Sequence, residues 1–279
     1  MQKIDCKNIA ESIYKDIQSA ITDFRSTIRI SIIDGGSDEA SKKYISLKMQ
    51  KAIELGVKAD LVRFSESSKI EEVLTKIDSL NKDKSVNGVL VQLPLYAQLA
   101  PYKHRILNSI NPLKDVDGLS AINFGLYSQD IMNGILPATV DACLEVIKSS
   151  YKNEFQGSNI LIINNSDLIG KPLGMVLSTL GATVTIANEF TSNLDTLLRS
   201  ADIVISATGK GHLFTENNLK EGALVIDVTS IRKEDKTIGD FKIENEDKDL
   251  LYTPVPGGIG PLTIACLFRN LINLAKLQQ

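Results

Sequence analysis

The sequence predicts a two-domain α/β protein, because strands and helices alternate in two separate stretches of the chain. A length of 279 residues suffices for two compact domains, each with its own core. Hydrophobic residues make up 43% of the chain and charged residues 23%, which is typical of a globular protein. Each alternation favours a mostly parallel sheet covered by helices.

The first alternation forms an N-terminal α/β lobe. β-branched runs such as "IRISII" indicate strands, and Tyr44, Leu47, Lys48 and Ile53 recur at helical spacing. The expected elements are a helix at 9–24, a strand at 28–33, a helix at 39–55, a strand at 59–64, a helix at 70–81 and a strand at 87–95. Prolines and a loss of regularity then predict a loop region over 96–136.

The second alternation has the layout of a Rossmann-like, doubly wound parallel-sheet domain. It follows a helix at 139–150, and its expected strands are 159–163, 183–187, 202–207 and 224–228, with helices at 170–180 and 193–200. A last apolar helix, at about 261–276, is expected to return to the first lobe. The predicted domains are therefore 1–137, 138–257 and a C-terminal helix over 258–279.

Composition narrows the function classes. A net charge of −3 without a basic stripe argues against nucleic acid as a partner. The start "MQKIDCKNIAESIYKDI" lacks a signal-peptide pattern, and no apolar run reaches the length that spans a bilayer, so we expect a cytoplasmic protein without membrane association. Three scattered cysteines and only two histidines also argue against a metal site.

The stretch "ILIINNSDLIGKP" (160–172) raises the question of a dinucleotide-binding turn. In such a turn, glycines let the chain bend and approach the pyrophosphate, which the helix N-terminus then stabilises. Here Asn164 and Asn165 stand where the early glycines would be, followed by Ser166, and Gly170 enters the helix. Asparagine tolerates a left-handed backbone, so Asn164 is expected to make the turn. An ordinary strand-to-helix loop is the alternative.

The end of the next strand bears on the cofactor. In this layout an acidic residue there binds a ribose 2′-hydroxyl, whereas arginine suits a 2′-phosphate. The chain has Glu189 at this place, so a bound dinucleotide would be NAD rather than NADP. The alternative is that Glu189 is simply a solvated loop carboxylate.

Three side chains of the first lobe suggest chemistry. Tyr44 and Lys48 are four residues apart on a predicted helix, so a ring and an amine project from one face. Desolvation can lower the pKa of such a lysine enough for proton exchange near neutrality. Gln92 ends an apolar strand, where side chains point toward the usual ligand crevice. A surface lysine beside a half-buried tyrosine is the alternative.

Two further stretches are candidates for binding. "KDVDG" (114–118) lacks the other ligands of a calcium loop, and Asp117 is better interpreted as an acceptor for N–H groups of a heterocycle. In "TPVPGGIGPLT" (253–263), prolines stiffen the segment and glycines let the backbone approach a ligand. An interdomain hinge is the alternative for that segment.

Taken together, these stretches closely resemble the bifunctional methylenetetrahydrofolate dehydrogenase/methenyltetrahydrofolate cyclohydrolase family over nearly the whole chain. The matching pieces are "GSDEASKKYISLKMQKAIELGV", "NGVLVQLPL", "NPLKDVDGLSAINFGLY", "GKPLGMVLSTLGATVT", "ADIVISATGK", "KEGALVIDV" and "TPVPGGIGPLTIACLFRN". The resemblance implies that Lys48 is the central catalytic residue, that Tyr44 stacks on the folate, that Gln92 tunes Lys48 and that Asp117 anchors the pterin. It also implies substrate contacts from Pro256, Gly257 and Gly258, and a homodimer formed through the second domains.

The implied reaction is oxidation of 5,10-methylenetetrahydrofolate to 5,10-methenyltetrahydrofolate with NAD or NADP, followed by hydrolysis to 10-formyltetrahydrofolate. The implied cofactor residues are Asn164, Asn165, Ser166, Gly170, Glu189 and Thr229. The chain departs from the family here: Asn164 to Ser166 replace a glycine-led triplet, and Thr229 replaces the glycine after "VIDV". A bifunctional enzyme with NAD, one with NADP, a cyclohydrolase alone and a non-catalytic folate-binding regulator all stay open.

Overall fold

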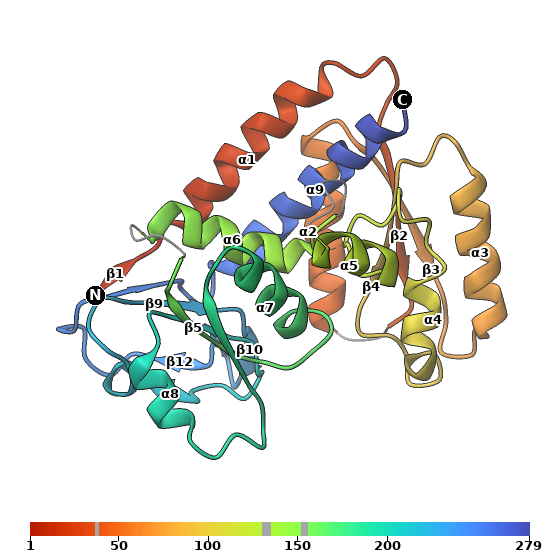
Figure 1. Ribbon diagram of the computed structural model, residues 1–279. Helices are drawn as coiled ribbons and strands as arrows, with labels where there is room; N and C mark the ends of the chain where they lie inside the picture. Colours follow the sequence, from red (N-terminus) through yellow and green to blue (C-terminus); the bar gives the residue numbers. More distant parts are fainter. Residues whose placement is uncertain (37–38, 130–134, 152–155) are drawn as a thin grey trace. The chain divides into compact units, whose positions relative to one another are not determined.

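The computed structural model describes residues 1–36, 39–129, 135–151 and 156–279 (Figure 1). The chain divides into two compact units. One unit comprises residues 13–138 and 267–279, and we call it the three-stranded unit after its sheet. The other comprises residues 1–12 and 139–266, and we call it the six-stranded unit.

The three-stranded unit is built on a parallel sheet with the strand order β3-β2-β4. β2 is buried along most of its length because its isoleucines face helices on both sides of the sheet. The elements of the unit are α1 (Cys6–Ile21, in part), β2 (Arg29–Asp34), α2 (Glu39–Glu54), β3 (Lys58–Arg63), α3 (Ile70–Lys82), β4 (Gly88–Gln92), η1 (Ala100–Tyr102), α4 (Lys103–Leu107), α5 (Ala121–Ser128) and the end of α9 (Ile259–Leu277).

Helices α3 and α4 share one core with β2 and β4. Ile77 of α3 and Ile106 of α4 are fully buried in this core together with Val89 of β4. The last part of α9 also contacts the sheet, since a Cβ atom at Gly88 would lie 2.6 Å from Leu271. The Nδ2 of Asn270 on α9 donates to two backbone carbonyls of the same unit, at 3.1 and 2.9 Å. The prediction that the C-terminal helix returns to the first lobe is therefore confirmed.

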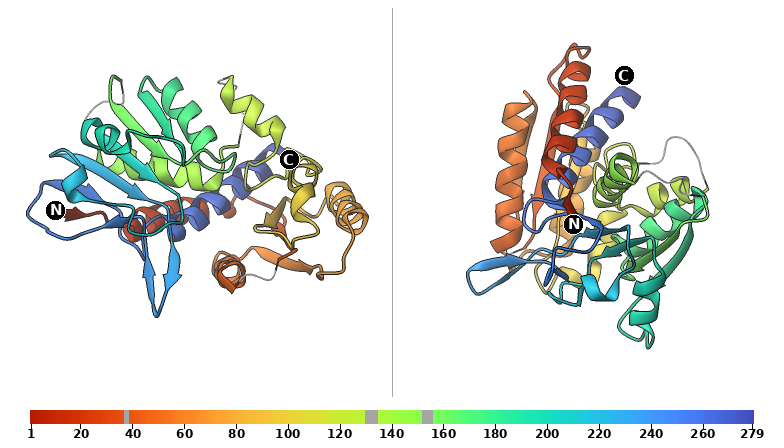
Figure 2. Two further views of the ribbon diagram at one scale, coloured as in Figure 1. Left: turned by 90° about the horizontal axis from the view of Figure 1, so that it is seen from below. Right: turned by 90° about the vertical axis from the view of Figure 1, so that its left-hand side faces the viewer.

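The six-stranded unit contains a wholly parallel main sheet with the order β1-β13-β9-β7-β5-β6. Its strands run outward from β5 in both directions, which confirms the predicted doubly wound sheet. The elements are β1 (Gln2–Lys3), α6 (Ala138–Ser150), β5 (Asn159–Ile163), α7 (Gly170–Thr179), β6 (Thr183–Ala187), α8 (Leu194–Ser200), β7 (Ile203–Ser206), β8 (Phe214–Thr215), η2 (Glu216–Asn218), β9 (Ala223–Asp227), β10 (Ile231–Lys233), β11 (Lys236–Ile238), β12 (Phe241–Lys242) and β13 (Leu250–Tyr252). Figure 2 shows the β10–β11 hairpin extending away from the main sheet.

The structure adds elements that the sequence pattern does not reveal. Helices α4 and α5 lie in the region predicted as a loop, of which residues 130–134 fall outside the described part of the chain. β1 pairs with β13, so residues 1–12 cluster with the six-stranded unit. A two-residue strand is too short to show alternation, and its partner is distant in sequence. The boundaries at 137 and 257 stay a prediction about independent domains.

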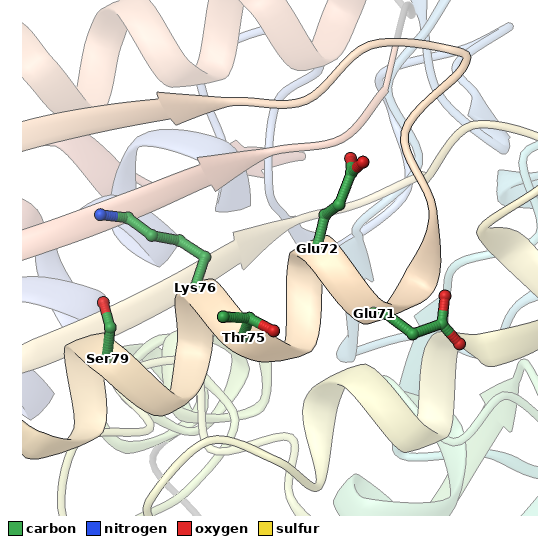
Figure 3. A pocket seen from close by; sticks show the side chains of 5 residues that line it. All are labelled: Glu71, Glu72, Thr75, Lys76 and Ser79. Carbon is green, nitrogen blue, oxygen red and sulfur yellow. The ribbon is translucent and has the colours of Figure 1, made fainter.

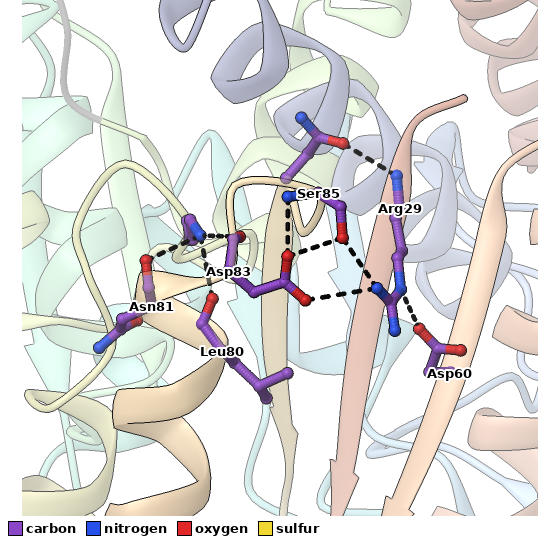
Figure 4. A network of polar contacts seen from close by, with 8 residues as sticks. Arg29, Asp60, Leu80, Asn81, Asp83 and Ser85 are labelled. Carbon is purple, nitrogen blue, oxygen red and sulfur yellow. Dashed lines mark hydrogen bonds and ion pairs between the residues drawn. The ribbon is translucent and has the colours of Figure 1, made fainter. Parts of the chain in front are cut away.

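A polar network ties the strand ends of the three-stranded unit together (Figure 4). The guanidinium of Arg29 on β2 pairs with Asp60 on β3 and donates to the Ser85 hydroxyl at 2.9 Å. Asp83 accepts from the same Ser85 hydroxyl at 2.7 Å.

Among the residues that the structure describes, none of the helices combines the length and apolar character needed to cross a bilayer.

Candidate active site

Lys48 and Gln92 form the centre of the candidate site in the three-stranded unit. Lys48 lies on α2 with only 7% of its surface exposed, and its Nζ donates to Oε1 of Gln92 at 2.9 Å. Gln92 is the last residue of β4, and its Nε2 donates to the carbonyl oxygen of Leu93 at 2.8 Å. Because both ends of the amide are engaged, Gln92 presents an oxygen to the amine in a fixed orientation.

The Lys48 amine and the Asp117 carboxyl influence each other's protonation. Burial lowers the pKa of Lys48, and the negative charge of Asp117 opposes that shift. Burial raises the pKa of Asp117; Lys48 lowers it, and neighbouring Asp115 raises it further. An amine with a lowered pKa exchanges protons closer to neutral pH than a solvated lysine does. The predicted grouping of Lys48, Gln92 and Asp117 thus corresponds to a chemically coupled cluster.

Tyr44 lies one helical turn before Lys48 and is partly buried. Burial raises the pKa of its hydroxyl, so the phenol stays neutral at physiological pH. A neutral phenol offers a ring face and a hydrogen bond rather than a base. Stacking of this ring on a folate stays a prediction.

The turn that carries Asp117 is held by its own backbone and by Asp115. The Asp115 carboxylate accepts from the backbone N–H of Ser120 at 2.8 Å and from Nδ2 of Asn123 at 3.0 Å. Gly118 has a φ of 65°, and a Cβ atom there would lie 2.7 Å from the carbonyl oxygen of Ile135. Only glycine fits this position without strain, which explains the "DG" step after Val116. The motif in the sequence indicates Asp117 but does not reveal the supporting role of Asp115.

The first residue of the same motif has a structural position. The Nζ of buried Lys114 donates to the carbonyl oxygens of Leu80, Asn81 and Asp83 at 2.9, 2.9 and 2.7 Å. These carbonyls lie at and just beyond the C-terminus of α3, where a cation is favourable (Figure 4). Lys114 therefore joins the "KDVDG" turn to α3 instead of facing the Lys48 cluster.

Ser41 is a second residue that the sequence analysis missed. Its Oγ donates at 2.9 Å to the carbonyl oxygen of Leu93, which is also the acceptor for Gln92. The start of α2 is thereby joined to the residue that directly follows β4. The sequence does contain a sign of this role. Ser41 precedes Lys48 by seven residues on the predicted helix, so the two residues lie on the same face, two turns apart.

In the six-stranded unit, the turn after β5 is organised by the side chain of Asn164. Its Oδ1 accepts from the backbone N–H of Ser166 at 2.8 Å, from the Ser166 hydroxyl at 2.6 Å and from the backbone N–H of Gly170 at 3.0 Å. Its Nδ2 donates to the carbonyl oxygen of Ala207, after β7, at 2.7 Å. The Asn164 carbonyl also lies close to Gly170, because a Cβ atom there would be 1.9 Å from its oxygen.

The expectation of a left-handed backbone at Asn164 is wrong. Among the described non-glycine residues, a positive φ occurs only at His212 and Glu234. Asparagine serves this turn through its side-chain hydrogen bonds, in the manner of an Asx turn, rather than through an unusual φ.

Thr229 also contributes hydrogen bonds inside the six-stranded unit. Its hydroxyl donates to Asp240 at 2.7 Å and accepts from the backbone N–H of Gly209 at 3.0 Å. Burial pushes the pKa of Asp240 upward, but hydrogen bonds from Ser206 and Thr229 outweigh it and the pKa is lowered. Burial raises the pKa of nearby Asp227 to about 7. The residue that replaces the family's glycine thus fastens the loop after β7 to a buried carboxylate.

The remaining predicted residues are placed but their roles are untested. Glu189 and Asn165 are exposed on the loops after β6 and β5. Pro256 and Gly257 are exposed and Gly258 is buried, all three in the six-stranded unit, whereas Lys48 belongs to the three-stranded unit. Their contacts with substrate or cofactor stay predictions.

One hollow on the surface of the three-stranded unit lies apart from this chemistry. A hollow on the outer side of α3 is lined by five polar side chains of that single helix: Glu71, Glu72, Thr75, Lys76 and Ser79 (Figure 3). None of them belongs to the Lys48 cluster. Within the described ranges, no three histidine, cysteine or acidic side chains gather in a way that would hold a metal ion.

Comparisons with known proteins match the chain to one family. The model of the tetrahydrofolate dehydrogenase/cyclohydrolase catalytic domain matches residues 4–117, and that of the family's NAD(P)-binding domain matches residues 137–279. A curated relative, the "Bifunctional protein FolD 2" of Lactobacillus johnsonii, is 39% identical over 99% of this chain and 96% of its own.

Solved structures agree. The bifunctional FolD methylenetetrahydrofolate dehydrogenase/cyclohydrolase of Campylobacter jejuni is 33% identical, with a TM-score of 0.91 and full coverage of both chains. The enzyme of Trypanosoma brucei, solved with NADP and an inhibitor, is 28% identical, with a TM-score of 0.92 over 99% of this chain and 97% of its own. From its motifs, its fold and its relatives, the chain belongs to the tetrahydrofolate dehydrogenase/cyclohydrolase family.

Proposed function

We propose that the chain is a bifunctional enzyme of tetrahydrofolate one-carbon interconversion. It oxidises 5,10-methylenetetrahydrofolate to 5,10-methenyltetrahydrofolate and hydrolyses the latter to 10-formyltetrahydrofolate. The observation that carries the proposal is the buried Lys48 amine, hydrogen-bonded to Gln92 at 2.9 Å and with a lowered pKa. A pure binding module has no need of such an amine, and family membership supports both activities.

In the hydrolytic step, water adds to the cationic methenyl carbon. The neutral Lys48 amine accepts the proton that the attacking water loses, and a carbon–oxygen bond forms. The bond between the adduct carbon and the ring nitrogen then breaks, and this nitrogen takes up a proton from the Lys48 ammonium. The adduct hydroxyl releases its proton to solvent as its oxygen becomes the formyl carbonyl, and the formyl group stays on the other nitrogen. Gln92 orients the amine throughout, because its own Nε2 is fixed on Leu93.

Asp117 and Tyr44 hold the substrate in this proposal. The Asp117 carboxylate accepts hydrogen bonds from N–H groups of the pterin, and the Tyr44 ring packs on a flat face of the folate. Asp117 has a second effect, because its charge keeps the pKa of Lys48 from falling further. The same residue therefore contributes to binding and to proton transfer.

The six-stranded unit fits a nicotinamide dinucleotide. The carboxyl ends of β5 and β6 carry the loops of Asn164 and Glu189, the place where doubly wound sheets bind dinucleotides. A bound NAD would accept the hydride of the methylene carbon. Asn165 lacks the positive charge that a 2′-phosphate needs, and exposed Glu189 repels such a phosphate but accepts from a ribose hydroxyl. These residues support NAD over NADP.

One set of absorbance assays tests the proposed function. Methylenetetrahydrofolate is supplied with NAD, NADP or neither, and the decay of supplied methenyltetrahydrofolate is followed separately. The proposal expects oxidation with NAD above NADP, and hydrolysis in the separate arm. Hydrolysis without oxidation would leave a cyclohydrolase alone, and no activity in any arm would favour a non-catalytic folate-binding regulator.

A variant isolates the cofactor argument. Glu189→Ser removes the repelling charge, so the preference for NAD over NADP should shrink or reverse while hydrolysis stays at the parental rate. An unchanged preference would contradict the role of Glu189.

Association and location complete the proposal. A homodimer through the six-stranded unit is supported by Leu180 and Ile186, which are exposed apolar residues at edge strand β6 and the turn before it. Sedimentation of the parental chain and an Ile186→Asp variant tests it, with a shift to monomer expected in the variant. Three buried cysteines that form no disulfide, Cys6, Cys143 and Cys266, support the cytoplasm as a reducing location.

A further inference from the structure

We propose that Asn164 is an internal competitor of the cofactor's diphosphate, which lowers dinucleotide affinity until its side chain is displaced. This inference rests on the proposed binding of NAD by the six-stranded unit. It concerns the turn between β5 and α7, residues 164–170.

The hydrogen-bond donors of this turn already have an acceptor within the chain. The first N–H groups of a helix lack partners within the helix, and a diphosphate bound at a helix N-terminus normally receives such groups. Here one oxygen, Oδ1 of Asn164, already accepts from the N–H groups of Ser166 and Gly170 and from the Ser166 hydroxyl. The side-chain oxygen thus stands in the place of a phosphate oxygen.

The backbone of the turn does not require the Asn164 side chain. Asn164 is not among the described residues with positive φ, so its conformation is open to glycine and to other residues alike. The close approach of its carbonyl to Gly170 constrains Gly170, not the Asn164 side chain. Removing the side chain should therefore free the donors while the turn keeps its path.

The Asn164 side-chain amide is held through both its oxygen and its nitrogen. Its Nδ2 donates to the Ala207 carbonyl at 2.7 Å, so the amide cannot rotate away without losing that bond as well. To bind here, a diphosphate must replace all of these internal hydrogen bonds with its own. The net free energy of binding gained per donor is therefore small. Because NAD and NADP carry the same diphosphate, the effect applies equally to both and differs from the selectivity that Glu189 exerts.

The test compares Asn164→Gly with the parental protein and a matched control. Asn159→Gly makes the same change in an exposed side chain at the opposite end of β5. Calorimetry measures the dissociation constants of NAD, of ADP-ribose and of adenosine, which lacks phosphate. Asn164→Gly should bind NAD and ADP-ribose at least about fivefold more tightly, roughly the size of one net hydrogen bond, with adenosine unchanged. The control should match the parental protein.

Amide hydrogen exchange provides a readout independent of affinity. Without cofactor, the amides of Ser166 and Gly170 should be protected in the parental protein and exchange faster in Asn164→Gly. NAD should restore their protection in the variant. Equal exchange in both proteins would overturn the inference, because the donors would then not depend on the side chain.

The binding outcomes separate this inference from the proposed function. Unchanged or weaker NAD binding by Asn164→Gly, with an unchanged urea-denaturation midpoint as proof of folding, overturns the inference and makes Asn164 a support for the ligand. If NAD binds neither protein, the inference fails together with the dehydrogenase half of the proposed function. Lack of oxidation despite tighter NAD binding would contradict the function alone.

Discussion

Replacing Lys114 by methionine should destabilise the protein strongly although the residue lies outside the Lys48 cluster. The substitution keeps most of the buried aliphatic stem and removes the ammonium group. Nζ then no longer donates to the carbonyls of Leu80, Asn81 and Asp83. At about 1 kcal/mol of net stability per hydrogen bond, the loss is about 3 kcal/mol. Loss of the cation at the α3 C-terminus acts in the same direction.

The matched control is Lys82→Met at the same end of α3. Lys82 is exposed and pairs with Asp78 one turn earlier, so its replacement should change the free energy of unfolding by less than about 0.5 kcal/mol. Urea denaturation at neutral pH measures both variants. A loss below about 1 kcal/mol for Lys114→Met, or equal losses for the two variants, would refute the reasoning.

Two further predictions concern pH. Asp117→Asn removes the negative charge that keeps the pKa of Lys48 from falling further. The acid limb of the cyclohydrolase pH–rate profile should therefore move to lower pH. An unmoved limb would show that Asp117 carries no charge in the parental protein. Asp227 keeps its proton up to about pH 7 in the folded chain but releases it near pH 4 when unfolded. Relative to Asp227→Asn, the parental protein should therefore lose stability between about pH 4 and pH 7. Urea denaturation at both limits measures the free energy of unfolding of the two proteins. The same change with pH in both would contradict this prediction.

Much of the fold follows from the sequence because each long helix or strand shows its hydrophobic pattern within one stretch of the chain. Strands β2, β5 and β7 are isoleucine-rich runs that are buried along most of their length. The pairing of β1 with β13 is different, since two or three residues show no period and the register depends on contacts between distant segments. Helical spacing also overstated burial, because Ile53 is 77% exposed on α2.

The candidate site was predictable where it depends on periodicity. Tyr44 and Lys48 share a helical face by their spacing, and Gln92 is at the carboxyl end of a strand. The pairing of Gln92 with Lys48 followed from the family resemblance and not from the pattern. Asn164 was assigned a backbone role, whereas its side chain makes the hydrogen bonds of the turn. Side-chain orientation and long-range acceptors such as the Leu93 carbonyl depend on tertiary packing, which a single sequence does not display.

The central claim is that Lys48, oriented by Gln92, transfers the protons of the hydrolytic step. The most direct test compares the decay of methenyltetrahydrofolate with Lys48→Met and with Lys43→Met, an exposed lysine on the same helix. The account predicts a loss of about 10²- to 10⁴-fold in kcat for Lys48→Met, with folate binding largely kept, and a parental rate for Lys43→Met. Hydrolysis by Lys48→Met at the parental rate would contradict it.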